Sequence, residues 1–185
     1  MLFRSLVPLE HLDWLESLRP MTSTPLAIGE LFNNPNEWKP LIAKHLIDYI
    51  RIHISQIGGI TPAHKIQIFS EQYGVQVSWH GPGDLSPVGH AANVHIDIAA
   101  SNVRYQEWSG TEPPNFVIQK LSGPKEALLD VFVGLPEYSQ GYVYPNEKPG
   151  LGIEINEKEA AKYPCSRDTT LWTQTRRLDG SIQQP

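Results

Sequence analysis

The stretch Val75-Gln76-Val77-Ser78-Trp79-His80-Gly81-Pro82-Gly83-Asp84-Leu85-Ser86-Pro87 contains the pattern that decides the fold. It is an apolar run that ends in a polar side chain, followed by a turn and by the start of a helix. Ser86 can accept a hydrogen bond from a free amide of the first helical turn, and a proline at the first helical position has no amide to leave unpaired. The stretch therefore predicts a strand, a sharp turn and a helix.

The same order recurs along the chain. Apolar runs at 26–28, 47–54 and 103–105 each contain or precede a polar side chain, and helix starts follow at Asn34-Pro35 and Thr61-Pro62. The first stretch contributes His80, and the full set of polar residues is Glu30, Arg51, His80 and Glu107, at intervals of 21, 29 and 27 residues. Each interval has room for a loop, a helix and a strand, which is the crossover that parallel strands require. Segment 61–73 has apolar side chains at helical spacing.

This repetition predicts an α/β fold of the β/α-barrel type, with the strands inside and the helices outside. In such a barrel the chemistry lies at the carboxyl ends of the strands, because the loops there can vary without disturbing the packed interior. We therefore expect Glu30, Arg51, His80 and Glu107 to gather at one end of the sheet.

Composition narrows the functional class. The chain has 185 residues and a net charge of −5 with both signs interspersed, so nothing in it indicates a nucleic-acid surface. No apolar run is long enough to span a bilayer, and the opening residues are too short and too soon interrupted for a secretory signal. Cys165 is the single cysteine, which excludes an internal disulfide and makes a reducing, cytoplasmic setting the default.

The composition of the chain changes near residue 109. From there proline and glycine interrupt it every few residues, and such residues disfavour continuous helix or strand. We interpret 1–108 as the barrel part and 109–185 as an irregular carboxyl-terminal tail with one short helix near 157–162. The tail is expected to pack against a neighbouring element and to cover part of the pocket.

Each candidate side chain has a functional and a structural interpretation. His80 could act as an acid, a base or a donor to a hydroxyl, or it could only cap its turn. Glu30 could hold a hard cation such as magnesium, or it could be a solvated loop residue. A buried guanidinium at Arg51 needs an anion, either a substrate carboxylate or a neighbouring acidic side chain, and we favour this over a purely structural ion pair.

Other polar and aromatic residues carry weaker signals. Glu107 means little by itself, and Trp172 could be a pocket wall or part of the core. Asp84 is expected to project above the barrel beside His80. His53 lies two residues beyond Arg51 and could share its face, whereas His90 and His95 are interpreted as surface or packing histidines without chemistry.

Three strings resemble a known family. They are Pro25-Leu26-Ala27-Ile28-Gly29-Glu30-Leu31-Phe32-Asn33, Asp48-Tyr49-Ile50-Arg51 followed by Ser55-Gln56-Ile57-Gly58-Gly59-Ile60-Thr61-Pro62, and Trp79-His80-Gly81-Pro82-Gly83-Asp84. They are similar to the D-mannonate dehydratase group of the enolase superfamily. The resemblance extends along nearly the whole chain and includes the tail.

The resemblance implies a magnesium-dependent lyase that removes water from a sugar acid of the mannonate or gluconate type and forms a 2-keto-3-deoxy sugar acid. It also implies that the chain contains the carboxyl-terminal half of a TIM-type barrel, from a remnant of the fourth strand to the eighth, with the tail packed on the barrel and on a capping domain. Carried over by residue, Glu30 would be the third metal carboxylate. Arg51, His80, Asp84 and Glu107 would contact the substrate, and Trp172 would line the pocket.

The sequence also departs from that family. The first metal carboxylate, the tyrosine base and the histidine acid have no counterpart, and Arg4 stands where the family has the second carboxylate. A lone carboxylate facing a cation holds Mg²⁺ poorly. We therefore expect a truncated, inactive member or a gene fragment. The alternative is a non-catalytic sugar-acid binding or interaction module, acting as a homo-oligomer or paired with a full-length relative.

Overall fold

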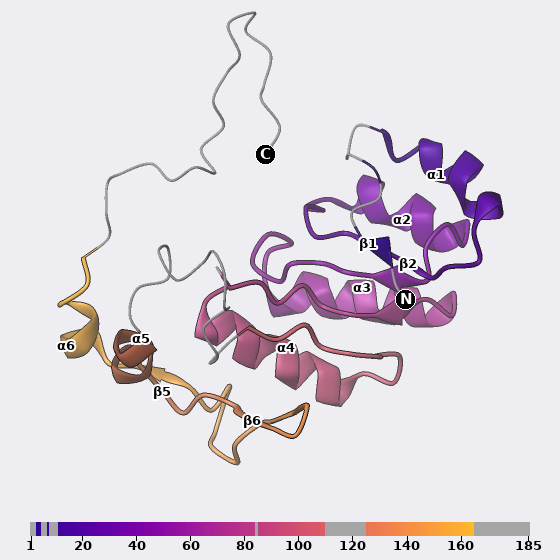
Figure 1. Ribbon diagram of the computed structural model, residues 1–185. Coiled ribbons are helices and arrows are strands. Elements are labelled where there is room, and N and C mark those ends of the chain that lie inside the picture. Colours follow the sequence, from indigo (N-terminus) through magenta and orange to yellow (C-terminus); the bar gives the residue numbers. More distant parts are fainter. Residues whose placement is uncertain (1–2, 5–6, 8–10, 84, 110–124, 165–185) are drawn as a thin grey trace, which may run out of the picture.

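The first hundred residues alternate strands and helices (Figure 1). The structure is a computed structural model that describes residues 3–4, 7, 11–83, 85–109 and 125–164. In chain order, the elements of the first part are β1 (Phe3–Arg4), α1 (Trp14–Leu18), η2 (Arg19–Met21), β2 (Leu26–Ile28), α2 (Pro35–Ala43), β3 (Tyr49–Ile50), α3 (Ile60–Gln72), β4 (Gln76–Val77) and α4 (Pro87–Ala99).

The four strands form one parallel sheet in the order β1-β2-β3-β4. Ile28 pairs with Ile50 and Ile50 with Val77, and a parallel bridge joins Val77 to Val103 at the far edge. Ladder hydrogen bonds continue past the short strands, because the His80 amide donates to the Ile52 carbonyl at 2.9 Å. Strands in sequence order with helical crossovers are half of a β/α barrel, which confirms the predicted fold.

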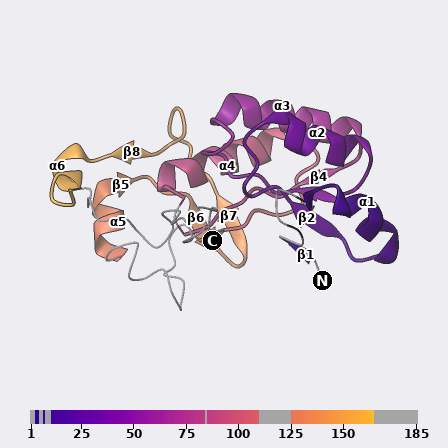
Figure 2. The same ribbon diagram turned by 90° about the horizontal axis from the view of Figure 1, so that it is seen from above.

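The core lies between the sheet and the helices. Side chains of the strands alternate between two faces, and the set that includes Ile28, Ile50 and Val77 is buried. Trp38 and Leu41 of α2 and Ile66 of α3, among others, belong to the same buried cluster. Figures 1 and 2 show α2, α3 and α4 side by side along the sheet, as a barrel requires of its outer layer.

Two of the three predicted helix starts are confirmed. The Asn34 side chain accepts from the Asn36 amide at 2.9 Å, and Ser86 accepts from the Gly89 amide at 3.2 Å. The predicted start at Thr61 is wrong, because α3 begins at Ile60 after Gly59. Gly59 has φ 96°, a conformation that glycine adopts without steric cost, so the backbone itself turns the chain into the helix.

The segment 125–164 lies beyond α4 in both views (Figures 1 and 2). It is more regular than predicted, because short antiparallel pairs tolerate prolines between them. The expected helix near 157–162 is present as α6, and Gln140-Gly141, both at positive φ, form the turn of a hairpin. The elements are α5 (Lys125–Val131), β5 (Phe132–Val133), β6 (Glu137–Ser139), β7 (Tyr142–Tyr144), β8 (Glu154–Ile155) and α6 (Glu157–Ala160), with β5 paired to β8 and β6 to β7.

Leu151, in the loop before β8, packs against the main core cluster. This contact ties the carboxyl-terminal segment to the half-barrel. None of the helices in the described ranges has the length and apolar character to cross a membrane.

Asn102 is a buried polar residue that holds the last strand position in place. Its side chain accepts from Gln67 at 2.9 Å and donates to the Val75 carbonyl at 3.0 Å. Asn102→Ala should lower the free energy of unfolding by about 2 kcal/mol, because the partners stay buried without a replacement. Urea denaturation measures this. The exposed Asn36→Ala should change little, and equal losses in the two variants would contradict the assignment.

Candidate functional site

The four polar residues predicted from the sequence meet at one edge of the sheet. Glu30 lies two residues beyond β2, Arg51 directly follows β3, and His80 lies three residues beyond β4. Glu107 comes four residues after the bridge at Val103. All four follow parallel strands, so the carboxyl ends of those strands bring them together.

Arg51 is the centre of this cluster. One guanidinium nitrogen, Nη1, binds Glu30 Oε2, and Nη2 lies 2.5 Å from Glu107 Oε2 and also contacts His80 Nδ1. The Arg51 side chain is 5% exposed, whereas the two carboxylates are 29% and 34% exposed. A buried guanidinium is costly unless it is paired, and here neighbouring acidic side chains meet that need, which is one of the two alternatives considered for Arg51.

Glu107 has an unusually low proton affinity. Burial raises the pKa of this carboxyl, but a hydrogen bond with His80, the charge of Arg51 and the Gly81 amide together outweigh burial and lower the pKa to about 2. His80 Nδ1 lies 2.7 Å from Glu107 Oε2, and the Gly81 amide donates to the same oxygen at 3.2 Å. Glu107 is therefore a carboxylate at neutral pH.

His53 belongs to the same site. Its ring lies edge-on to the His80 ring, with centroids 5.6 Å apart, and the Ser55 amide donates to its Nδ1 at 3.3 Å. The sequence signal for this placement is the spacing of two residues between Arg51 and His53, because alternate residues of an extended segment point to the same face. From the sequence we expect only a shared face with Arg51, and the structure adds the contact with the His80 ring.

The other candidates have different outcomes. Asp84 and Trp172 lie outside the described residues, so their predicted roles stay predictions. His90 is buried on α4 with its ring 4.9 Å from the Trp108 ring, which is a packing position. Glu30 is not a solvated loop residue, because Arg51 binds it.

Glycine at position 81 permits the close approach of the two strand ends. A Cβ built on Gly81 would lie 1.8 Å from the Glu107 carbonyl oxygen. Side-chain hydrogen bonds join the two segments. Gln106 Nε2 donates to the Trp79 carbonyl at 3.4 Å, and the Ser109 hydroxyl donates to the Gly81 carbonyl. His80 and Glu107 are thereby held on adjoining segments.

The described residues do not by themselves fit a magnesium site. Among them, no group of three or more His, Cys, Asp or Glu side chains is arranged to hold a metal ion. Glu30, the predicted metal carboxylate, is paired with Arg51. Mg²⁺ needs several oxygen ligands, and the two carboxylates of the cluster, Glu30 and Glu107, are both bound to the Arg51 guanidinium.

The pKa of Glu107 gives a pH-dependent prediction. A carboxyl whose folded pKa lies below its unfolded value stabilises the fold above pH 4.5, and this contribution is lost as the pH falls toward about 2. Melting temperatures measured from pH 7 to pH 2 should fall across that window. Glu107→Gln should flatten this part of the profile, whereas the exposed Glu147→Gln should reproduce the wild-type shape. An unchanged profile in Glu107→Gln would contradict the assignment.

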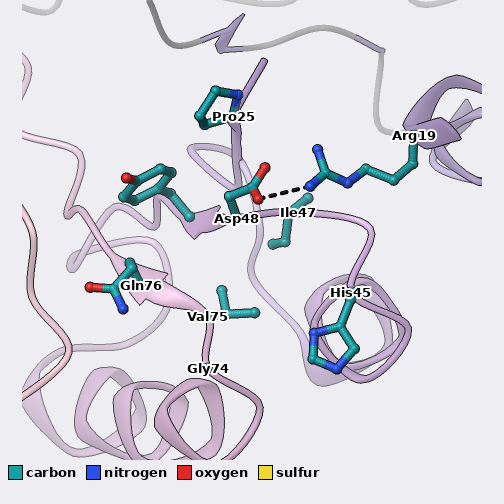
Figure 3. A pocket seen from close by; sticks show the side chains of 9 residues that line it. Arg19, Pro25, His45, Ile47, Asp48, Gly74, Val75 and Gln76 are labelled. Atoms are coloured by element: carbon teal, nitrogen blue, oxygen red, sulfur yellow. Dashed lines mark hydrogen bonds and ion pairs between the residues drawn. The ribbon is translucent and has the colours of Figure 1, made fainter. Parts of the chain in front are cut away.

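A separate cavity lies at the amino ends of the strands (Figure 3). It encloses about 360 Å³ and is lined by Asp48, Val75 and Gln76 among others. Arg19 reaches across it to Asp48 at 2.8 Å, and Asp48 also accepts from the Leu26 amide at 2.8 Å. These contacts tie η2 to the start of the sheet, at the end opposite the Arg51 cluster.

Fold and site together define the carboxyl-terminal half of a β/α barrel with a charged cluster at the carboxyl edge of its strands. A family model described as enolase C-terminal domain-like matches residues 6–159. The chain belongs to this family, which confirms the enolase-superfamily part of the predicted resemblance.

Curated relatives are longer than this chain. The D-galactonate dehydratase family member SEN1436 of Salmonella enteritidis is 52% identical over 176 residues, which cover 95% of this chain and 39% of the relative. The family member RspA of Pantoea ananatis is 53% identical with the same coverage. The chain thus spans about two fifths of the length of these relatives.

Solved structures of related enolases share the fold of this chain. An enolase from Pantoea ananatis with bound D-gluconate and Mg is 52% identical, with a TM-score of 0.83 over 98% of this chain and 41% of that one. An enolase from Agrobacterium radiobacter with bound Na and L-malate is 27% identical, with a TM-score of 0.77 over 98% of this chain and 45% of that one.

Proposed function

We propose that the Arg51 cluster binds a sugar acid of the mannonate or gluconate type, as the substrate-contact part of an enolase-type sugar-acid dehydratase site. The observation that carries this proposal is the buried guanidinium of Arg51 between Glu30 and Glu107, beside His80. A planar guanidinium can bind a carboxylate through two parallel hydrogen bonds. The adjoining imidazole and carboxylate are suited to hydroxyl groups, which both donate and accept.

The charges of the Arg51 cluster determine which ligands it can bind. Arg51 already has two anionic neighbours, so a sugar-acid carboxylate has to replace one of them rather than add to both. Glu30 and Glu107 are about a third exposed, so either can turn toward solvent when the ligand enters. A polyol without a carboxylate gains nothing from Arg51 and has only His80 and Glu107 to bind.

The relatives support this ligand class. The curated relatives carry the name of D-galactonate dehydratase family members, and the related enolase from Pantoea ananatis holds D-gluconate and Mg. Mannonate specificity, which the sequence resemblance implies, is the finer part of the proposal. Asp84 and Trp172 are proposed to complete the sugar-acid contacts.

We further propose that the 185-residue chain, tested alone, binds without turnover. Mg²⁺ is the family's expected cofactor, and Glu30 would be one ligand, but both carboxylates of the cluster, Glu30 and Glu107, are bound to Arg51. Among the described residues, no group of three or more His, Cys, Asp or Glu side chains could hold a metal ion. Position 4, where the family resemblance implies a second carboxylate, is an arginine in β1 that pairs in register with Ala27. Further ligands would have to come from outside the described residues.

Calorimetric titration of the chain with D-mannonate and D-gluconate, without metal, tests the binding proposal. Saturable heat with the acids and none with D-mannitol is expected, and absence of heat with both acids would overturn it. A parallel assay with Mg²⁺ for the 2-keto-3-deoxy product should detect none. Turnover that Glu30→Gln abolishes would overturn the second proposal.

An interaction role is the second candidate, favoured by the β6–β7 hairpin. Tyr138, Tyr142 and Tyr144 are 44%, 68% and 50% exposed on it, a concentration of aromatic surface typical of contacts between proteins. The partner would be a second copy or a full-length relative, in the cytoplasmic setting predicted from the sequence. Sedimentation velocity should show self-association that Tyr142→Ser weakens, and a monomer at all concentrations would remove the homo-oligomer.

A further inference from the structure

Helix α4 carries a polar stripe on its buried side. His90, Asn93 and Asp97 recur at helical spacing, and His90 and Asn93 are 1% and 0% exposed. Burial raises the pKa of Asp97 to about 7, and the nearby Trp79 acts in the opposite direction. Buried polar groups are retained at a cost in stability, so a stripe of them calls for a physical reason.

Each member of the stripe contacts a segment that carries a site residue. The His90 ring packs on Trp108, which follows Glu107, and Asp97 interacts with Trp79, which precedes His80. Asn93 contacts His80 itself, because its Nδ2 donates to the His80 carbonyl at 3.4 Å. The stripe therefore lies against both strand ends that form the His80–Glu107 pair.

The carbonyls of three successive residues bind side chains instead of a neighbouring strand. Trp79 O accepts from Gln106, His80 O from Asn93, and Gly81 O from Ser109. The last pairing with the segment of Val103 is its bridge to Val77. Beyond that bridge, the His80 amide holds the chain to the Ile52 carbonyl on one side, and these side chains hold it on the side of Glu107. Of the three donors, Asn93 comes from the helix rather than from the adjoining segment.

We infer that Asn93 is a positioning residue for the sugar-acid site, which fixes the backbone at His80 and thereby sets the approach of His80 and Gly81 to Glu107. This inference rests on the proposed function for its biological meaning. Asn93 is neutral, so it can orient the His80 carbonyl without adding charge to a cluster that already has two carboxylates and one guanidinium. Its complete burial keeps water from replacing the amide in this contact.

The Gly81 amide is a local reporter of this geometry, because it donates to Glu107 Oε2 at 3.2 Å. In the full chain, Asn93→Leu removes the amide and keeps the branching of the side chain. Hydrogen exchange measured by NMR should then accelerate at the Gly81 amide about tenfold more than at the Val77 amide, each compared with wild type. The Val77 amide lies in the sheet and reports on general stability. Ile96→Val on the same helix should change both amides in proportion.

The outcomes are distinct. Unchanged exchange at Gly81 relative to Val77 in folded Asn93→Leu, or an equal selective loss in Ile96→Val, would overturn the inference. If Asn93→Leu does not fold, Asn93→Ser supplies the same measurement with a shorter donor. Affinity for D-gluconate should fall about tenfold in the Asn93 variant. If the wild-type chain binds no sugar acid but the selective exchange effect persists, the proposed function is refuted and the positioning role remains.

Discussion

Arg51→Met should unfold at a markedly lower urea concentration than the wild type at pH 7. Glu30 and Glu107 would then face each other without the guanidinium that both now contact. Removing one partner of a buried ion pair typically costs 3–5 kcal/mol, and because the carboxylates are partly exposed we expect about 2–3 kcal/mol here. Sugar-acid binding should be lost in the same variant.

Two comparisons isolate the charge effect. Lowering the pH to about 4 should restore part of the stability of Arg51→Met, because protonation removes the repulsion between the two carboxyls. Arg19→Met breaks a more exposed ion pair with Asp48 and should cost less than about 1 kcal/mol. Equal losses in the two arginine variants would contradict the central place of Arg51.

Gly81→Ala should be the most damaging single-methyl addition at the site. The new Cβ would lie 1.8 Å from the Glu107 carbonyl oxygen and 2.7 Å from its carbonyl carbon, both backbone atoms that cannot rotate away. We expect a loss of about 3 kcal/mol, at the upper end of the cost of forcing atoms into a packed region. Separation of the strand ends should also weaken sugar-acid binding.

Gly74→Ala is the matched control. Gly74 has φ 69° but nothing within 4 Å of an added Cβ, so the substitution costs only about 1 kcal/mol of backbone strain. Denaturation of both variants by urea compares steric with conformational cost. A loss in Gly81→Ala no greater than that in Gly74→Ala would show that the two segments can separate freely.

The local sequence predicted much of this architecture. Apolar runs followed by Asn34-Pro35 and Ser86-Pro87 gave correct strands and helix starts, because cap hydrogen bonds form within a few residues. The meeting of Glu30, Arg51, His80 and Glu107 followed from the parallel arrangement alone. Thr61 failed as a helix start because the positive φ of Gly59, which no local hydrogen-bond signal marks, had already turned the chain.

The supporting contacts could not be predicted in the same way. Asn93, Gln106 and Ser109 act on backbone carbonyls across the fold, and their roles depend on how closely Gly81 lets two segments approach. The hairpin at Gln140-Gly141 was also missed, because prolines around it indicated irregular chain. Local patterns therefore located the charged groups, and tertiary packing determined how they are held.

NMR titration of the chain with D-gluconate tests the central claim most directly, with the Arg51 Nε–Hε signal and the Gly81 amide as reporters. We predict saturable shifts at both, with one dissociation constant, and little change at the Gln76 amide beside the cavity at the opposite end of the sheet. Shifts at Gln76 with none at Arg51 and Gly81, or no shift at any of them, would contradict the assignment of the Arg51 cluster as the sugar-acid site.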